Sequence, residues 1–328
     1  MPSRRSLLAV PAVLAFLVLA GGGTLLAGPN RFTRTGGPDG GSVTLLALAP
    51  GRLWTATSTS GLFTSTDGAA TWTAVVGTVD DHAGSGLGAD PDWAQGQIAA
   101  IAADPSHPGT VFAATQDSLF RTADGGASWN PAGLGAFVTF LAVAADGTDV
   151  YAASGYGGLW RSTNGGATWR TVRSARPFAI TSLAVDPHRA DVLYAGGQEQ
   201  GVLRSQDGGV HWRPLLRQSA LGERAVQHLA VDPSAPRLYA GTSDGLLLSR
   251  DGGTTWNDAD ASGPAPGTGQ VTAIALDPDT PGTVYVATRR DDYSTPTVAA
   301  LWKSDDAGAS WTRLLLGGIV SALVADPA

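Results

Sequence analysis

One eight-residue phrase recurs six times along this chain and constrains its fold more than any other feature. It reads Ser/Thr-x-Asp/Asn-Gly-Gly-x-Thr/Ser-Trp with small variations, and its copies span residues 65–72, 122–129, 162–169, 205–212, 249–256 and 304–311. Their closing tryptophans are 57, 40, 43, 44 and 55 residues apart. A period of about 40 to 45 residues with strand-like flanks is typical of one four-stranded propeller blade. The repeat therefore predicts an all-β propeller.

Each copy predicts a tight turn between two strands of a hairpin. The Asp or Asn side chain accepts hydrogen bonds from nearby backbone N–H groups, and glycine supplies positive φ without steric cost. The tryptophan that ends the phrase buries a large apolar face against the blade. We therefore assign a structural role to these residues of the six turns: Asp67, Trp72, Asp124, Trp129, Asn164, Trp169, Asp207, Trp212, Asp251, Trp256, Asp306 and Trp311.

On these six phrases the chain resembles the bacterial-neuraminidase (BNR) or Asp-box repeat proteins. Such repeats occur in sialidases, xyloglucan-cleaving glycosidases, sortilin-type receptors and photosystem II assembly factors. The resemblance covers residues 40–328 and implies a β-propeller of the sialidase-like superfamily. The families share the turn motif and differ in chemistry, so it does not fix a function.

Two further repeated phrases complete a unit of four strands, which we call A to D from the axis outward. The A phrase, for example 180–187, occurs seven times and the last copy is 320–327, whereas the turn motif occurs six times. Residues 32–36 read as an outer D strand without a turn motif. We expect six complete antiparallel blades and a partial seventh, with an A strand from the C-terminus and a D-like strand from the N-terminus. The lack of B and C strands suggests a truncated sequence or an incomplete last blade.

Strand direction alternates along each blade, which assigns every loop to one face of the ring. The A–B and C–D turns share one face, and the B–C and D–A loops share the other. The motif turns lie on the first face, here called the turn face. The long insertions 77–97, 258–270 and 289–300 lie on the second, here called the loop face. Long loops on a rigid scaffold commonly carry function, so we expect ligands to bind the loop face.

Trp93 is the one tryptophan outside the repeat frame, and it follows a run of carboxylates in the 77–97 insertion. An aromatic ring beside carboxylates suits stacking on a sugar with hydrogen bonds to its hydroxyls, although the same tryptophan could instead pin its own loop to the ring. Two tyrosines outside the B-strand positions and a mixed charge run extend this candidate site, although solvated charge also explains the run. The candidate ligand-binding residues are Asp80, Asp81, His82, Asp92, Trp93, Tyr156, Arg290, Asp292 and Tyr293.

The first 27 residues read as a signal peptide or an N-terminal membrane anchor, and residues 28–328 as the propeller domain. Arg4 and Arg5 precede an apolar run over residues 7–20, which small residues follow. This is the pattern of an export signal with cleavage after Ala20, and 3–8 resembles a twin-arginine motif. The alternative is an uncleaved tether through residues 7–27. Either alternative predicts an extracytoplasmic propeller.

Composition narrows the function classes. The net charge of -7 argues against nucleic acid as a partner. The chain has no cysteine, and its five histidines are scattered without metal-ligand spacing. We expect no cofactor, no metal and no identifiable catalytic residue.

The sequence favours an exported, non-catalytic propeller that binds a glycan or a protein, as assembly factors do. The alternative is a glycoside hydrolase, sialidase-like or xyloglucanase-like, acting on extracellular glycans. Glycosidases need two carboxyl groups at a defined separation, which loop residues such as Asp92 and Asp292 could supply. A sialidase would pair tyrosine with glutamate, but the chain has only Glu199 and Glu223 and lacks the usual N-terminal Phe/Tyr-Arg-Ile/Leu-Pro motif.

Overall fold

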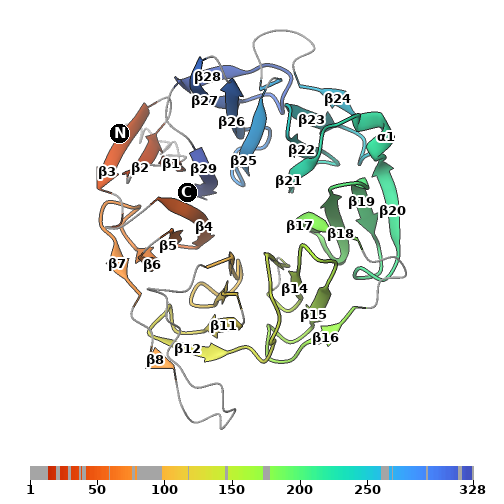
Figure 1. The fold of residues 1–328 in the computed structure, drawn as a ribbon. Coiled ribbons are helices and arrows are strands. Elements are labelled where there is room, and N and C mark those ends of the chain that lie inside the picture. The colour runs from red at the N-terminus through yellow and green to blue at the C-terminus, as the bar shows by residue number, and fades with distance from the viewer. Residues whose placement is uncertain are drawn as a thin grey trace, which may run out of the picture.

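The chain forms a ring of β-sheets around a central axis, and the two ends of the described chain meet in one sheet (Figure 1). The computed structural model describes residues 14–19, 23–28, 31–36, 38, 42–58, 60–75, 78–79, 98–116, 118–144, 147–172, 178–259, 266–267, 269–292, 295–316 and 320–326. In six of the sheets, four strands in sequence order run antiparallel to their neighbours from the axis outward. The predicted propeller of six four-stranded blades is therefore confirmed.

The first three blades follow one another along the chain. Blade 1 contains β4 (Val43–Ala49), β5 (Arg52–Thr57), β6 (Gly61–Ser65) and β7 (Thr73–Ala74). Blade 2 contains β9 (Ala100–Ala103), β10 (Val111–Ala114), β11 (Leu119–Thr122) and β12 (Ser128–Pro131), and β8 (Thr78–Val79) adds a parallel fifth strand beside β12. Blade 3 contains β13 (Phe140–Val143), β14 (Val150–Ala153), β15 (Leu159–Ser162) and β16 (Arg170–Thr171).

The next three blades repeat this order, with one short helix, α1 (Gln218–Leu221), between blades 4 and 5. Blade 4 contains β17 (Ile180–Asp186), β18 (Arg189–Gly197), β19 (Gly201–Ser205) and β20 (Trp212–Leu216). Blade 5 contains β21 (Val226–Val231), β22 (Leu238–Thr242), β23 (Leu246–Ser249) and β24 (Asn257–Asp258). Blade 6 contains β25 (Gln270–Leu276), β26 (Val284–Asp292), β27 (Thr295–Ser304) and β28 (Thr312–Leu316).

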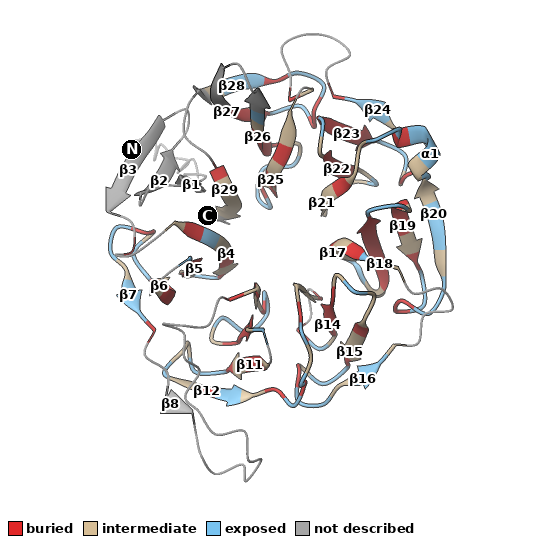
Figure 2. Cartoon of the chain, in the orientation of Figure 1, coloured by how far each residue is buried: buried red, intermediate tan, exposed pale blue. Residues whose placement is uncertain are grey.

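The hydrophobic core lies between neighbouring blades. The B strands are apolar on both sides, and all four residues of β10 and of β14 are buried. Trp54 of blade 1 meets Trp129 of blade 2 edge to face, with ring centroids 6.0 Å apart. Figure 2 shows the exposed residues gathered on the outermost strands, such as β7, β16 and β24. Each blade therefore depends on its neighbours for burial of its apolar faces.

The motif turns are hydrogen-bonded as the sequence predicts. In the first, the carboxylate of Asp67 accepts from the Ser65 hydroxyl (2.8 Å), the Thr71 N–H (2.9 Å) and the Thr71 hydroxyl (2.6 Å). The Ser65 hydroxyl oxygen in turn accepts from the N–H of Ala69 at 2.9 Å. The hydroxyl of Thr71 is the largest cause that lowers the pKa of Asp67 to about 2. These contacts close the turn and support the structural role assigned to it.

The two faces are arranged as strand direction predicts. In blade 2 the N–H of Gly125, in the motif turn, donates to the carbonyl of Gly109, in the A–B turn, at 3.0 Å. Blade 5 repeats this contact between Gly252 and Pro236 at 2.7 Å. The motif turns and the A–B turns therefore share the turn face.

The seventh sheet differs from our expectation of a partial blade. Its strand order is β29 (Val320–Asp326), β1 (Leu14–Leu19), β2 (Gly23–Gly28) and β3 (Arg31–Gly36). The inner C-terminal strand and the outer N-terminal strand are placed as predicted. However, two further N-terminal strands occupy the B and C positions, so the sheet has four strands. The apolar run that we assigned to export has the composition of a buried strand as well, which explains the difference.

In the described part of the chain, α1 is short, and no helix there combines the length and apolar character needed to cross a membrane.

Candidate ligand-binding face

The structure describes three of the nine predicted ligand-binding residues, Tyr156, Arg290 and Asp292. Asp80, Asp81, His82, Asp92, Trp93 and Tyr293 lie outside the described residues. Arg290 is exposed on β26, where it pairs with Val298 of β27. Asp292 ends β26 and pairs with Thr295 at the tip of the same hairpin. The grouping of these residues around Trp93 therefore stays a prediction.

Tyr156 is the predicted site residue that the structure places most clearly. It lies in the B–C turn of blade 3, and its side chain is 88% exposed. Phe137, in the D–A segment before β13, is 37% exposed, and the two ring centroids are 6.1 Å apart with an interplanar angle of 41°. B–C turns and D–A segments share the loop face, so the two rings form one exposed aromatic surface on the predicted binding face.

The turn that carries Tyr156 is held by local hydrogen bonds. The N–H of Tyr156 donates to the Ser154 hydroxyl at 3.1 Å, and the N–H of Gly157 donates to the Ser154 carbonyl at 3.0 Å. Gly157 has a φ of +93°, which only glycine adopts without strain. The N–H of Gly155 donates to the Thr139 hydroxyl at 2.9 Å, which ties the turn to the segment carrying Phe137. The aromatic pair is therefore mounted on an ordered support.

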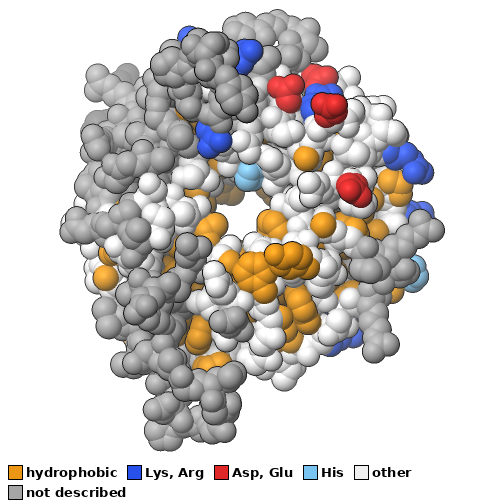
Figure 3. Space-filling model, in the orientation of Figure 1, with side chains coloured by type: hydrophobic (Ala, Val, Ile, Leu, Met, Phe, Trp, Pro, Cys, Tyr) orange, Lys and Arg blue, Asp and Glu red, His pale blue; other side chains and the backbone are white. Residues whose placement is uncertain are grey.

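Phe178 packs beside the Tyr156 turn at the entry to blade 4, where it is partly buried against the core. A Cβ at Gly157 would lie 3.2 Å from the carbonyl oxygen of Phe178, so the Tyr156 turn packs on the segment that enters blade 4. The ring of Phe178 meets Trp212 edge to face at 5.5 Å. Figure 3 shows hydrophobic side chains gathered beside the central opening of the ring. Sequence analysis missed Phe137 and Phe178, although both are aromatic residues in loop-face segments outside the repeat phrases.

Several described carboxylates near this face already have partners. The carboxylate of Asp244 accepts from the N–H of Gly269 at 3.1 Å, and Asp258 forms an ion pair with Arg224. No group of three or more His, Asp or Glu side chains in the described residues is arranged to hold a metal ion. In the described residues this face therefore carries an exposed aromatic pair whose turn is held by hydroxyl side chains, with charged residues on blades 5 and 6.

His228 lies on the inner strand β21, in the position that Phe140 occupies on β13. Burial lowers its pKa to about 4, so the imidazole is neutral at pH 7. This histidine therefore contributes no positive charge to the ring near neutral pH.

The chain is similar in sequence to enzymes that act on xyloglucan. A probable oligoxyloglucan-reducing end-specific xyloglucanase of Neosartorya fischeri is 23% identical over 336 residues, which is 83% of this chain and 39% of that protein. A xyloglucanase of a Paenibacillus species is 25% identical over 282 residues, covering 68% of this chain and 27% of the enzyme. The chain thus spans less than half the length of these relatives. No family model matches it.

Solved structures with the same fold include enzymes and a protein bound to a peptide. The GH74 xyloglucanase of Xanthomonas campestris superposes with a TM-score of 0.66 and 21% identity, over 92% of this chain and 47% of that enzyme. The GH74 enzyme of Niastella koreensis gives 0.66 and 16%, over 91% and 46%. YCF48 bound to D1 peptide gives 0.61 and 16%, over 87% and 91%. At these identities the likeness establishes the propeller fold, while the sequence relatives point toward xyloglucan-degrading enzymes.

Proposed function

We propose that this chain is a polysaccharide-binding propeller domain directed to β-glucan chains of the xyloglucan type. The observation that carries the proposal is the exposed pair of Tyr156 and Phe137 on the loop face. A large aromatic ring that is 88% exposed leaves its apolar face in water, which favours a binding role over a packing role. The C–H groups on one side of a pyranose ring can cover such a surface.

The surroundings of the pair suit a neutral sugar chain. The side chains that hold the Tyr156 turn, Ser154 and Thr139, are uncharged hydroxyls. A neutral glucan requires stacking surfaces and hydroxyl partners, whereas an acidic glycan requires cations beside the rings. The similarity to xyloglucanases supports the same substrate class and favours the glycoside hydrolase alternative over a non-catalytic module.

Hydrolysis of the bound glucan is the second candidate function, and the similarity to xyloglucanases favours it. It requires two carboxyl groups about 5 Å apart for retention, or roughly 6.5–9.5 Å apart for inversion of configuration. We propose Asp92 of the 77–97 insertion and Asp292 at the tip of the β26–β27 hairpin as the acids, with Asp80, Asp81, Asp90 and Asp291 of the same insertions as the alternatives. The relatives are more than twice as long, so a second domain is the alternative source of a catalytic carboxylate.

Calorimetric titration with xyloglucan oligosaccharides tests binding. We expect Tyr156→Ala and Phe137→Ala each to weaken binding about tenfold, the loss of one stacked ring. Val210→Ala is the matched control, because Val210 is 38% exposed in the motif turn of blade 4, on the opposite face. Equal affinity of Tyr156→Ala and the wild type would remove the aromatic pair from the binding site.

A reducing-end assay on the same oligosaccharides tests hydrolysis. New reducing ends formed by the wild type, and lost in both Asp92→Asn and Asp292→Asn with binding retained, would support catalysis by these two carboxylates. Binding without any release of reducing ends would leave a non-catalytic glycan-binding domain.

We also propose that the domain acts outside the cytoplasm. The support is in the sequence, where Arg4 and Arg5 precede the apolar run 7–20. Cell fractionation with an antibody to the propeller tests it, and recovery of the whole pool from the cytoplasm would contradict it.

A further inference from the structure

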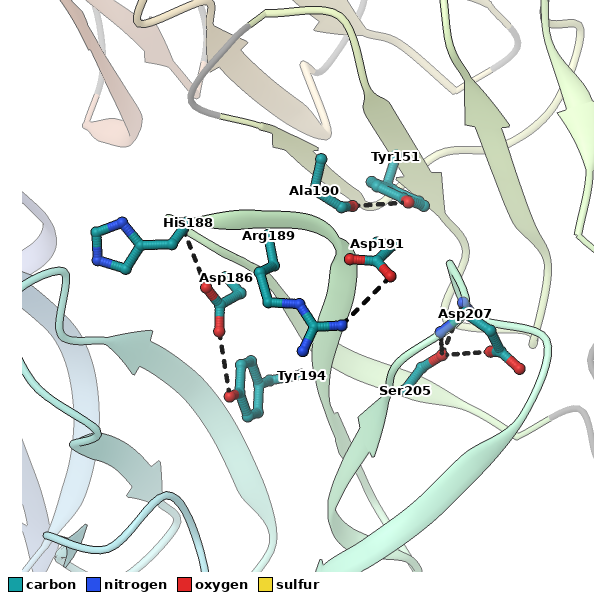
Figure 4. A network of polar contacts seen from close by, with 10 residues as sticks. Tyr151, Asp186, His188, Arg189, Ala190, Asp191, Tyr194, Ser205 and Asp207 are labelled. Atoms are coloured by element: carbon teal, nitrogen blue, oxygen red, sulfur yellow. Dashed lines mark hydrogen bonds and ion pairs between the residues drawn. The ribbon is translucent and has the colours of Figure 1, made fainter.

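A pocket of about 430 Å³ opens on the turn face between blades 4 and 5, away from the aromatic pair. Three guanidinium groups line it, those of Arg189, Arg204 and Arg237, against the two carboxylates of Asp186 and Asp232. Its volume lies in the range of small-molecule sites. Figure 4 shows the polar contacts on the blade 4 side of this pocket.

The two carboxylates are engaged by the protein. Asp232 is buried and accepts from the Ser234 N–H at 2.7 Å, the Ser234 hydroxyl at 2.6 Å and the Arg237 guanidinium at 3.0 Å. Asp186 accepts from the His188 N–H at 3.0 Å and, more weakly, from the Tyr194 hydroxyl at 3.5 Å. Asp232 is therefore paired with a cation inside the fold, and Asp186 is held by neutral hydrogen-bond donors.

Arg204 is not compensated in this way. Its guanidinium lies over the ring of Tyr194, 5.7 Å from the centroid, and no carboxylate in the described residues pairs with it. Its Nε is buried and has no hydrogen-bond partner. A buried donor on a charged group is costly to leave unpaired, so this group favours a ligand that accepts hydrogen bonds.

At the junction of blades 3 and 4, the corresponding arginine is paired with a carboxylate and covered by the next motif turn. Arg161 of blade 3 occupies the position of Arg204, lies over Tyr151 at 5.4 Å and pairs with Asp149 at 2.7 Å. A Cβ at Gly208, in the next motif turn, would lie 2.6 Å from the Arg161 guanidinium, so that turn covers the arginine.

The junction of blades 4 and 5 lacks both features. Val192 occupies the position that Asp149 has in blade 3. Each of the two residues comes directly before the part of the B strand that pairs with the C strand carrying the arginine. A Cβ at Gly252, the counterpart of Gly208, would have only the Pro236 side chain within 4 Å, at 4.0 Å. The space between Arg204 and Gly252 is therefore open, and both residues line the pocket.

We propose that this pocket binds the oxyanion group of a small ligand, a carboxylate or a phosphate on a molecule of about monosaccharide size. Arg204 provides the unpaired donors, while Arg237, paired with Asp232, and Arg189, paired with Asp191 at 3.5 Å, line the sides. Planar guanidinium groups bind carboxylate and phosphate oxygens through paired hydrogen bonds. The site is separate from the proposed glucan site, which lies on the opposite face.

Titration calorimetry with inorganic phosphate and with glucuronate, at an ionic strength held constant with chloride, tests the proposal. We expect saturable binding of at least one of them, with a dissociation constant on the order of 1 mM. The tighter of the two anions identifies the ligand as a phosphate or a carboxylate. Failure of both anions to bind in a saturable way would overturn the proposal.

Matched variants locate the binding. Arg204→Gln should weaken it about tenfold, the effect of losing one charged pair. Arg121→Gln should not, because Arg121 holds the same position on β11, also with an unpaired Nε, but does not line this pocket. Pro236→Glu, which puts a carboxylate on the exposed rim without altering Arg204, should weaken it as well. Unchanged binding in both Arg204→Gln and Pro236→Glu, or an equal loss in Arg121→Gln, would place any bound anion elsewhere.

Discussion

Gly126 and Trp54 meet across the junction of blades 1 and 2, where a Cβ on the glycine would lie 2.6 Å from the indole ring. Gly126 also has a φ of +90°. The motif turn of one blade is thus closed directly against an aromatic side chain of the blade before it.

Gly126→Ala should therefore combine backbone strain with a steric clash. We expect a loss of roughly 3 kcal/mol in the free energy of unfolding, from 1–2 kcal/mol of left-handed strain plus overpacking. Gly68→Ala is the control, since Gly68 has a φ of +66° but no atom within 4 Å of its Cβ position, so only strain applies. Urea denaturation measures the free energy of unfolding of both variants. Equal losses in Gly126→Ala and Gly68→Ala would show that Trp54 moves aside without cost.

The acceptor of the motif turn should matter for stability and not for ligand binding. Asp124 accepts from the Ser128 N–H at 3.0 Å and from the hydroxyls of Thr122 and Ser128. Asp124→Ala leaves these donors to water and should cost about 1–2 kcal/mol of unfolding free energy. Glucan affinity should not change, because the turn lies on the opposite face from Tyr156. A folded Asp124→Ala protein that no longer binds glucan would refute the assignment of the two faces.

His228 should make stability depend on pH between about 6.5 and 4. Burial lowers its pKa from 6.5 to about 4, so the folded state holds the neutral form and the unfolded state protonates first. The stabilisation is complete above pH 6.5 and is lost as the pH falls toward 4, amounting to at most about 3 kcal/mol. The variant His228→Leu should flatten the unfolding free energy over this range.

The carboxylates of the motif turns should affect stability at lower pH than His228 does, so the two effects can be distinguished. Hydrogen bonds to the Thr255 N–H lower the pKa of Asp251 to about 2, and the Ser310 hydroxyl does the same for Asp306. Their contribution is present above the unfolded pKa near 4 and is lost as the pH falls to about 2. A stability curve of His228→Leu that still falls between pH 6.5 and 4 would mean that another group titrates there.

The sequence predicts the repeated part of this molecule well, because the information is local. The turn of Asp67 needs an acceptor, a hydroxyl and residues that tolerate positive φ, and all of these stand within eight residues. Strand direction then places the turns on one face without further information.

The candidate site is less predictable, since it depends on contacts between segments that the repeat does not specify. Tyr156 was identifiable because it lies outside the repeated positions. Its neighbour Phe137 precedes the A strand of the same blade. The pairing of Phe140 with Ala153 brings both residues to one edge, whereas the approach of their rings to 6.1 Å depends on the conformations of the two loops. The openness of the Arg204 pocket likewise depends on a neighbouring blade, which no single repeat reveals.

Ala307 gives a test of backbone strain in the sixth motif turn. It has a φ of +59°, although five of the six copies have glycine at this position. Ala307→Gly should raise the unfolding free energy by about 0.5–1 kcal/mol, because glycine adopts this conformation without strain. Ala309→Gly is the control: its φ is not positive, so the same change there should not stabilise. A destabilised Ala307→Gly protein would mean that the buried methyl group outweighs the strain.

The last prediction concerns the residues to which we assign both an export signal and two strands. In the structure β1 pairs with β29 from Leu14 opposite Asp326 to Leu19 opposite Val320, and β2 joins β1 to β3. A chain that begins at residue 29 would lose both middle strands, leaving β29 and β3 with unpaired edges. We expect this deletion to lower the melting temperature by more than about 10 °C, whereas deletion of residues 1–13 alone should change it little.

N-terminal sequencing of the protein recovered from outside the cytoplasm then shows whether residues 1–20 are removed. A mature chain beginning at Gly21, with a melting temperature equal to that of the full chain, would show that the ring does not depend on β1 and that the segment serves export alone.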